Sequence, residues 1–232
     1  MKKIILCLGL MTGLLILSVF PVFASDLPKC KRSEKLHDCF GTKSYKKSKY
    51  VGEWQNGRWN GHGTYTYSNG AEYEGDFKDN QKNGQGSYTY ANGSKYVGSF
   101  RADLKNGQGT LTLLSNGNSY SGEWKDDQIN GKGTYTYVNG NRYIGDFKDD
   151  RKHGIGQYTY ANGNQYIGDF GDDQINGIGT YTYANGNQYI GGFTDSKKHG
   201  QGTYSYARGG QYRGMFQNNQ QNGQGTFIDA NG

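Results

Sequence analysis

The side chains best suited to proton transfer near neutral pH are the histidines. They are His37, His62, His153 and His199. His153 and His199 stand at a recurring position where sister segments carry asparagine, as at Asn106. A general acid or base is not normally replaced by asparagine in sister copies, so this pattern indicates turn residues. No serine or cysteine stands in a recognisable nucleophile elbow or dyad, and the Gly-x-Gly pairs lead into strand-like sequence rather than a helix, which excludes a phosphate loop. We therefore predict that the protein is not an enzyme and uses no cofactor.

Pairs of adjacent aspartates are the next candidates, because carboxylates are ligands for calcium. The pairs are Asp126-Asp127, Asp149-Asp150 and Asp172-Asp173. They lack the alternating oxygen ligands of a dedicated calcium loop, so solvated polar turns are the favoured interpretation. A zinc site built on Cys30 and Cys39 has only His37 nearby, whereas structural zinc takes four ligands. The sequence predicts no metal site.

A repeated phrase, Tyr-x-Gly-x-Phe/Trp, organises most of the chain. It begins at Tyr50, Tyr73, Tyr96, Tyr120, Tyr143, Tyr166, Tyr189 and Tyr212, in steps of 23 or 24 residues. A fixed period of this length indicates a repeat architecture. Bulky and small residues alternate within each copy, which is the period of a strand. The fold class predicted is all-β: an elongated, single-layer antiparallel meander of about eight 23-residue hairpins.

The composition of the two connections in each repeat predicts their turn types. Asn185-Gly186 has the signature of a two-residue type I′ hairpin turn, and 171–176 ("GDDQIN") resembles a longer polar loop. With that turn, Tyr181 lies opposite Ile190, and aromatic side chains are expected on both faces of the sheet. Gly191 is expected to leave room for a neighbouring ring to lie flat across the strand.

The aromatic rows have two interpretations, packing within the sheet or binding of a partner. The candidate binding residues are Tyr50, Trp54, Trp59, Tyr73, Phe77, Tyr96, Phe100, Tyr120, Trp124, Tyr143, Phe147, Tyr166, Phe170, Tyr189, Phe193, Tyr212 and Phe216. Trp59 is an extra tryptophan in a slot otherwise held mainly by lysine or isoleucine. It suits a membrane interface, a polymer or packing at the N-terminal end of the sheet.

The segment "YVGEWQNGRWNGHGTYTYSNG", residues 50–70, resembles the MORN (membrane occupation and recognition nexus) repeat at nearly every position, and the resemblance extends over 50–232. It implies a gently twisted single-layer sheet, a role as a scaffold for protein–protein contacts and, in some members, binding of acidic phospholipids. Most copies depart from the family by carrying Phe where Trp is preferred. The glycine three residues after that aromatic survives only as Gly57; asparagine and aspartate tolerate the left-handed backbone required there.

Residues 1–24 have the pattern of a secretory signal peptide, with two lysines before an apolar run and Ala24 at the cleavage position. An uncleaved inner-membrane anchor is the alternative. We predict an exported bacterial protein, located in the periplasm or outside the cell. Export makes a disulfide possible, and Cys30 and Cys39 are expected to pair.

The positive charge lies in the basic lead-in, 25–49, and not in the repeat domain, 50–232. The lead-in has 8 Lys/Arg and 3 Asp/Glu, a net charge of +5, whereas the repeats have 16 and 17, a net charge of −1. Such a run is usually solvated and flexible. The candidate contacts to anionic lipid are Lys43, Lys46, Lys47 and Lys49. Nucleic acid is not an expected partner of an exported chain.

Two irregular places complete the analysis. Leu111, Leu113 and Leu114 interrupt the tyrosine pattern, as repeat drift or as an apolar anchor for a partner. The segment 225–230, with Phe227 and Ile228, resembles an unprotected edge strand, which predicts a homodimer or a partner that adds its own strand.

The sequence as a whole predicts a non-enzymatic scaffold of the cell envelope or exterior that docks a protein partner. Carbohydrate or peptidoglycan binding by tyrosine rows, and peripheral binding to anionic lipid through the basic lead-in, are the alternatives.

Overall fold

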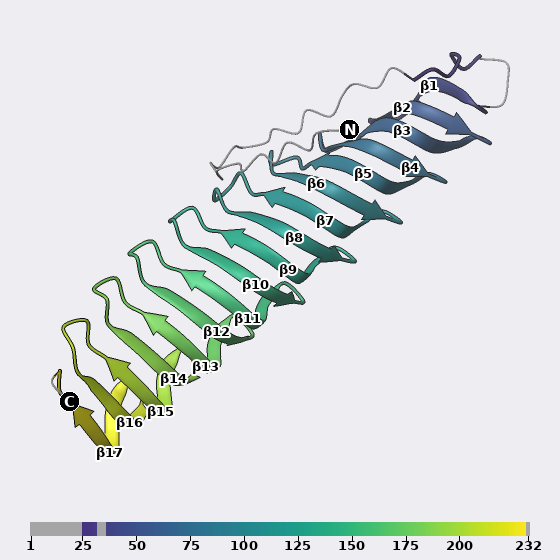
Figure 1. Cartoon of the computed structure of the whole chain (residues 1–232). Helices are drawn as coiled ribbons and strands as arrows, with labels where there is room; N and C mark the ends of the chain where they lie inside the picture. Colours follow the sequence, from purple (N-terminus) through teal and green to yellow (C-terminus); the bar gives the residue numbers. More distant parts are fainter. Residues whose placement is uncertain (1–24, 32–35, 231–232) are drawn as a thin grey trace, which may run out of the picture.

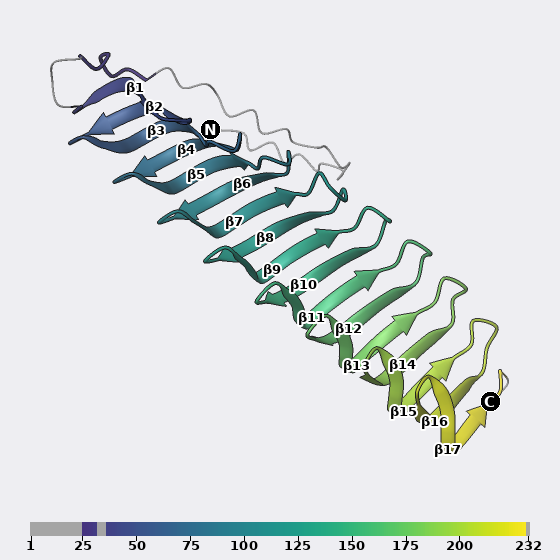
Figure 2. The same ribbon diagram turned by 180° about the vertical axis from the view of Figure 1, so that it is seen from behind.

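The computed structural model describes residues 25–31 and 36–230, and over these residues the chain is one open antiparallel sheet of seventeen strands without a helix. Each strand pairs with the next along the chain. Two opposite views show a long twisted strip with no second layer (Figures 1 and 2). The predicted all-β meander of about eight 23-residue hairpins is confirmed.

The strands are β1 (Cys39–Tyr45), β2 (Ser48–Gln55), β3 (Arg58–Thr66), β4 (Glu72–Lys78), β5 (Gln81–Thr89), β6 (Lys95–Arg101), β7 (Leu104–Thr112), β8 (Ser119–Lys125), β9 (Gln128–Thr136), β10 (Arg142–Lys148), β11 (Arg151–Thr159), β12 (Gln165–Gly171), β13 (Gln174–Thr182), β14 (Gln188–Thr194), β15 (Lys197–Ser205), β16 (Gln211–Gln217) and β17 (Gln220–Ile228).

The two connections of each repeat are the reverse of those expected from the sequence. The tight turn is the acidic one: Asp172 and Asp173 join β12 to β13 with φ values of 47° and 70°, and positive φ at both positions is the requirement of a type I′ turn. The Asn-Gly connection is the longer one. Tyr183 donates its N–H to the Asn187 carbonyl at 2.8 Å, and Gly186 donates to the Tyr183 carbonyl at 2.9 Å.

This longer loop moves the register of the following strand by one residue. Tyr181 lies opposite Tyr189, and Thr180 lies opposite Ile190. A shift of one residue changes the face to which every side chain of a strand points, so the prediction of aromatic residues on both faces is wrong. The Tyr-x-Tyr rings lie on the same face as the buried tyrosines and pack against them. We call this the aromatic face and the opposite one the outer face.

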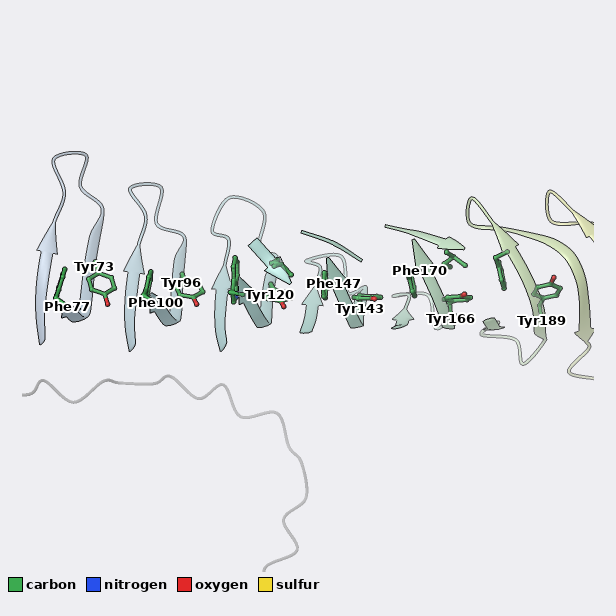
Figure 3. Close-up of a cluster of buried hydrophobic side chains, with 14 of the residues drawn as sticks. Tyr73, Phe77, Tyr96, Phe100, Tyr120, Tyr143, Phe147, Tyr166, Phe170 and Tyr189 are labelled. Atoms are coloured by element: carbon green, nitrogen blue, oxygen red, sulfur yellow. The ribbon is translucent and has the colours of Figure 1, made fainter. Parts of the chain in front are cut away.

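The core consists of tyrosine rings laid flat over pairs of glycines, as expected for Gly191. The ring of Tyr166 covers Gly168 on its own strand and Gly179 on the next, where a β-carbon would collide with it. Its hydroxyl donates to the carbonyl of Asp169 at 3.0 Å, and the side chain is fully buried. Five of the other buried tyrosines are drawn with it in Figure 3.

Edge-to-face ring contacts continue this core from one repeat to the next. Tyr166 meets Phe170 of its own repeat with ring centroids 5.2 Å apart, and meets Phe193 of the following repeat at the same distance. The interplanar angles are 81° and 80°, an arrangement that aromatic quadrupoles favour. The rows of rings are visible along the sheet in Figure 3.

Hydrogen bonds along both long edges of the sheet also join neighbouring repeats. At the tight turn, the Asp173 N–H donates to the Lys152 carbonyl at 3.0 Å, and the Asp173 carboxylate accepts from the Lys152 N–H at 3.0 Å. On the other edge, the side chain of Asn164 accepts from the Ala184 N–H at 2.9 Å and donates to the Tyr181 hydroxyl at 3.0 Å. The second aspartate of a turn therefore links two repeats and is more than a solvated turn residue.

The N-terminal end of the sheet extends into the lead-in that was expected to be flexible. β1 pairs with β2 along its whole length, and a disulfide joins Cys30 to Cys39, the pair expected from the sequence. The segment before β1 covers its outer edge, because the Cys30 N–H donates to the Phe40 carbonyl at 2.9 Å and the Phe40 N–H donates to Pro28 at 2.8 Å. The expected signal peptide, 1–24, lies outside the described residues. Over the described part of the chain, no helix is long and apolar enough to cross a membrane.

Substitution of a socket glycine, a glycine covered by a buried tyrosine ring, should lower the stability of the fold far more than substitution of a turn aspartate. Gly179→Val places a branched side chain in the space of the fully buried Tyr166 ring, and we expect it to lower the free energy of unfolding by about 3 kcal/mol. Asp172→Ala should cost about 1 kcal/mol or less, because Ala102 already occupies the equivalent turn position with a φ of 48°. Urea unfolding of both variants measures the difference, and equal midpoints would contradict the socket explanation.

Dimerisation through β17 stays a prediction. This strand is exposed along most of its length, and Phe227 retains 61% of its surface. Pairing of two copies through 225–230 should give a concentration-dependent dimer that Phe227→Lys weakens. Mass measurement in solution decides, since a strict monomer at tens of micromolar that Phe227→Lys does not change would rule the dimer out.

Candidate functional site

The candidate rows of aromatic residues form the core of the sheet and not its surface. Their relative exposure lies between 0% and 8%. They are Tyr50, Trp54, Tyr73, Phe77, Tyr96, Phe100, Tyr120, Trp124, Tyr143, Phe147, Tyr166, Phe170, Tyr189, Phe193, Tyr212 and Phe216. Side chains this deeply buried are not available to a partner. This burial does not fit the binding role for which these residues were candidates. Of the two interpretations, packing is the one that the structure supports.

The rings that are accessible to a partner belong to the Tyr-x-Tyr pairs. From the sequence these pairs were expected on the face opposite to the buried tyrosines. They are half-buried and follow one another along one side of the aromatic face. They are Tyr65, Tyr67, Tyr88, Tyr90, Tyr135, Tyr137, Tyr158, Tyr160, Tyr181, Tyr183, Tyr204 and Tyr206. Within a pair the rings are close, as for Tyr181 and Tyr183 at 4.7 Å, and successive pairs meet at about 6 Å or less, as for Tyr183 and Tyr204 at 5.8 Å.

Beside these tyrosines runs a second row with one residue per repeat, which we call the slot residues. Each lies directly across the tight turn from a buried Phe or Trp, as Lys198 lies opposite Phe193, and therefore points to the aromatic face. The slot residues are Trp59, Lys82, Lys105, Ile129, Lys152, Ile175, Lys198 and Gln221. This position lies in a strand and not in the polar loop expected from the sequence.

Two of the four slot lysines, Lys105 and Lys152, are held between aromatic rings and a carboxylate. The Lys105 ammonium lies 4.4 Å from the centroid of the Trp124 ring and 3.9 Å from the Asp127 carboxylate. Burial lowers the pKa of Lys105 and of Lys82, and nearby aspartates partly offset this effect. Lys152 lies 3.2 Å from Asp173. A cation between rings and a carboxylate is stabilised by both.

Shallow hollows open between the tyrosine pairs and the slot residues. One has a volume of about 310 Å³ and is bounded by Tyr160, Tyr181, Tyr183 and Lys198, with Ile175 and Phe193 beneath. Another, of about 350 Å³, lies between Tyr88, Tyr90, Lys82 and Lys105. The aromatic face therefore carries a row of shallow hollows walled by tyrosine rings, which we call the groove, with slot lysines only at Lys82, Lys105, Lys152 and Lys198.

Trp59 fills the first slot and packs within the sheet. Its ring stacks on Tyr50 with centroids 4.8 Å apart and planes 13° apart, and meets the edge of Tyr45 at 6.0 Å. Its indole N–H is buried and has no hydrogen-bond partner within the described part of the chain. These contacts agree with packing at the N-terminal end, the last of the three interpretations given for this residue.

The candidate lipid contacts lie together on the first hairpin. Lys43, Lys46, Lys47 and Lys49 are all exposed, and Lys46 and Lys47 form the turn between β1 and β2. Of the three irregular leucines, Leu111 takes the place of a tyrosine against the core, whereas Leu114 is 69% exposed.

A model of the MORN repeat matches the chain in eight consecutive segments: 50–72, 73–95, 96–116, 120–142, 143–165, 166–188, 189–211 and 212–232. The chain belongs to the MORN repeat family. The family resemblance seen in the sequence is confirmed. The structure also explains the recurring pattern: the Tyr supplies the buried ring, the Gly leaves the space that this ring covers, and the Phe or Trp supplies the ring that meets it edge-to-face. The MORN repeat family is a non-enzymatic repeat scaffold.

Two of the solved structures that match this MORN repeat protein do so at low identity. The TCP domain of SAS-4 (dCPAP) of Drosophila melanogaster, in complex with a proline-rich motif of Ana2, is 14% identical over 72% of this chain and 83% of its own, with a TM-score of 0.42. The G-box domain of the microcephaly protein CPAP is 10% identical over 83% and 94%, with a TM-score of 0.43. No curated protein matches the chain.

Metal and catalytic sites are not evident in the described residues of this MORN repeat protein. No group of three or more His, Cys, Asp or Glu side chains within 25–31 and 36–230 is placed to hold a metal ion. His153 lies in β11 and His199 in β15, both exposed, so they are strand residues and not the turn residues predicted from the sequence.

The fold should fail at alkaline pH, because its core depends on neutral tyrosines. Burial raises the pKa of Tyr189 to about 12 and that of several other core tyrosines further, against about 10 in an unfolded chain. The corresponding stability is fully present below about pH 10 and is lost as the pH rises toward 12.

Tyrosinate absorbance and circular dichroism, recorded together against pH, test this expectation. The phenols of the core should ionise in the same steep transition in which the sheet is lost. Smooth titration of all tyrosines near their ordinary pKa, with the sheet intact, would contradict it.

Proposed function

We propose that this MORN repeat protein is a non-enzymatic scaffold that binds an extended segment of a partner protein along its aromatic face. The observation that carries the proposal is the row of half-buried tyrosine pairs beside the slot residues, which runs from Tyr65 to Tyr206 with one interruption at Leu111 and Leu113. Tyrosine supplies a large contact area with few rotatable bonds and a polar end, and for this reason it is enriched in protein interfaces.

The groove also has the architecture that such binding requires. Its floor is a rigid core of buried rings, so little conformational entropy remains to be lost when a partner binds. Hydrogen bonds between repeats hold neighbouring hollows in fixed positions relative to one another. Extended concave or grooved surfaces are how other repeat proteins engage long partners.

Two further functions expected from the sequence remain alternatives. Peripheral binding to anionic lipid is supported by the exposed hairpin with Lys46 and Lys47 at its tip, since each lysine near an acidic surface contributes about 1 kcal/mol. Binding of an envelope glycan is supported by the tyrosine row. However, successive exposed rings are tilted by about 45° to 72° rather than coplanar, as for Tyr135 and Tyr137 at 45°, which gives no long flat platform.

The proposed location is the periplasm or the outside of the cell, and it depends on the signal-like sequence of residues 1–24. The Cys30–Cys39 disulfide supports this proposal, because such bonds persist in oxidising compartments. Retention of Met1 in the protein purified from its native source would contradict cleavage.

Photo-crosslinking from the two faces tests the proposed function. A photoreactive amino acid at position 160, on the aromatic face, should give adducts with a protein in the native cell. The same residue at position 178, where Ile178 is 64% exposed on the outer face, is the control and should give none. Adducts from position 178 alone would contradict the proposal.

The same preparations separate the alternatives. Lipid binding requires anionic vesicles and weakens with salt, whereas glycan binding appears as salt-resistant sedimentation with cell walls. A protein scaffold shows neither behaviour.

A further inference from the structure

The slot lysines differ in whether a carboxylate neutralises them. The Lys152 ammonium lies 3.2 Å from Asp173, and that of Lys105 lies 3.9 Å from Asp127. In both repeats the aspartate belongs to the tight turn of the following repeat. The same carboxylate also accepts the backbone N–H of the lysine, at 3.0 Å for Lys152. The pairing is therefore built into the contact between consecutive repeats.

Lys198 has asparagine at the place of this aspartate. Asn219 accepts the Lys198 backbone N–H at 2.9 Å, as Asp173 does for Lys152, so the local structure is kept while the negative charge is absent. The Lys198 ammonium has one hydrogen bond, to the Tyr183 hydroxyl at 3.3 Å, and lies 4.8 Å from the centroid of the Tyr204 ring. No ion pair of Lys198 occurs among residues 25–31 and 36–230. Burial lowers the pKa of Lys198 without any carboxylate to offset it.

The hollow in front of Lys198 likewise lacks a carboxylate. At the preceding slot stands the apolar Ile175, and the turn position that pairs with it is Ser196 instead of aspartate. The hollow of about 310 Å³ therefore contains one ammonium and no carboxylate. In contrast, the hollow at Lys82 and Lys105 includes both Asp103 and Asp127.

We propose that the hollow at Lys198 is a subsite for a carboxylate side chain, aspartate or glutamate, of the protein segment that binds in the groove. The inference rests on the proposed function and specifies the chemistry of the partner at one position. A partly buried cation without a counter-ion has unused electrostatic attraction that a carboxylate can satisfy. The Tyr183 hydroxyl accepts from Lys198 and keeps its own proton to donate to the same carboxylate.

The structure favours a carboxylate over a phosphate. A single ammonium matches one negative charge, whereas phosphate groups are usually held by several cations or by arginine clusters. The walls beside Lys198 are the rings of Tyr181 and Phe193 and the side chain of Ile175, which fit the methylene groups of an acidic side chain. An acidic position in the partner, next to apolar ones, is therefore the expected pattern.

Peptide display on the full chain tests the subsite, with a library of random linear peptides as the probe. Peptides selected on the wild-type protein should be enriched in Asp or Glu at one position. The enrichment should disappear with Asn219→Asp and with Lys198→Gln, and a selected acidic peptide should lose about tenfold or more in affinity. Asn219→Asp is the decisive variant, because Asp173 and Asp127 show that this residue fits the turn.

Two matched variants control for charge and for position. Asn218→Asp adds the same charge one residue earlier, where Asp172 and Asp126 stand in sister turns and pair with arginine on the outside, at 3.5 Å for Asp172 and Arg151. Lys152→Gln removes a lysine that Asp173 already neutralises. Both controls should keep the acidic preference.

The outcomes separate the inference from the proposed function. Peptides that require the groove, as shown by loss on Tyr160→Ala, but carry no acidic preference or ignore Asn219→Asp would overturn the subsite alone. Selection of no peptide by any variant would overturn both.

Discussion

The fold depends on one constraint, which is that a single-layer sheet must build its core within its own thickness. Here the solution is a tyrosine ring laid across two glycines on adjacent strands, with its hydroxyl bonded to a backbone carbonyl three residues later, as in Tyr166. Glycine in a strand is ordinarily unfavourable, and in this sheet it provides the space for the ring. Each ring meets the aromatic residue of the next repeat edge-to-face, so a repeat is completed only by its neighbour.

The two faces of the sheet differ because of this core. The rings of the repeats lie on one face, where the buried tyrosines form the floor and the Tyr-x-Tyr rings the upper layer. The outer face has polar and charged side chains, such as Glu123 and Lys132, and scattered aliphatic ones, such as Ile155 and Ile178. The rigid, ring-lined face is suited to recognition, and the slot residues add the charges that distinguish one repeat from another.

Much of the fold could be predicted from the sequence, because the 23-residue period, the strand alternation and the glycine sockets are local patterns. The register could not. Asn185-Gly186 has the strongest composition for a two-residue turn, but Asp172 and Asp173 form that turn, since the side chain and the N–H group of Asp173 are fixed by the preceding repeat. One residue of register reverses the faces, and for this reason the exposed tyrosines were missed and the buried ones were considered for binding. The neutral partner of Lys198 is visible only once the turn of the next repeat is placed beside it.

The spacing of the slot residues has a consequence for what can lie along the groove. One repeat advances the sheet by two strands of about 4.8 Å each. A peptide in the extended polyproline II conformation advances about 3.1 Å per residue with three residues per turn, so three of its residues span almost one repeat and every third side chain would meet a successive slot. A helix, rising about 1.5 Å per residue, falls out of step. The order from Trp59 to Gln221 is not symmetric. The two directions along the groove are therefore not equivalent, and the same peptide bound in the reverse orientation would meet a different series of charges.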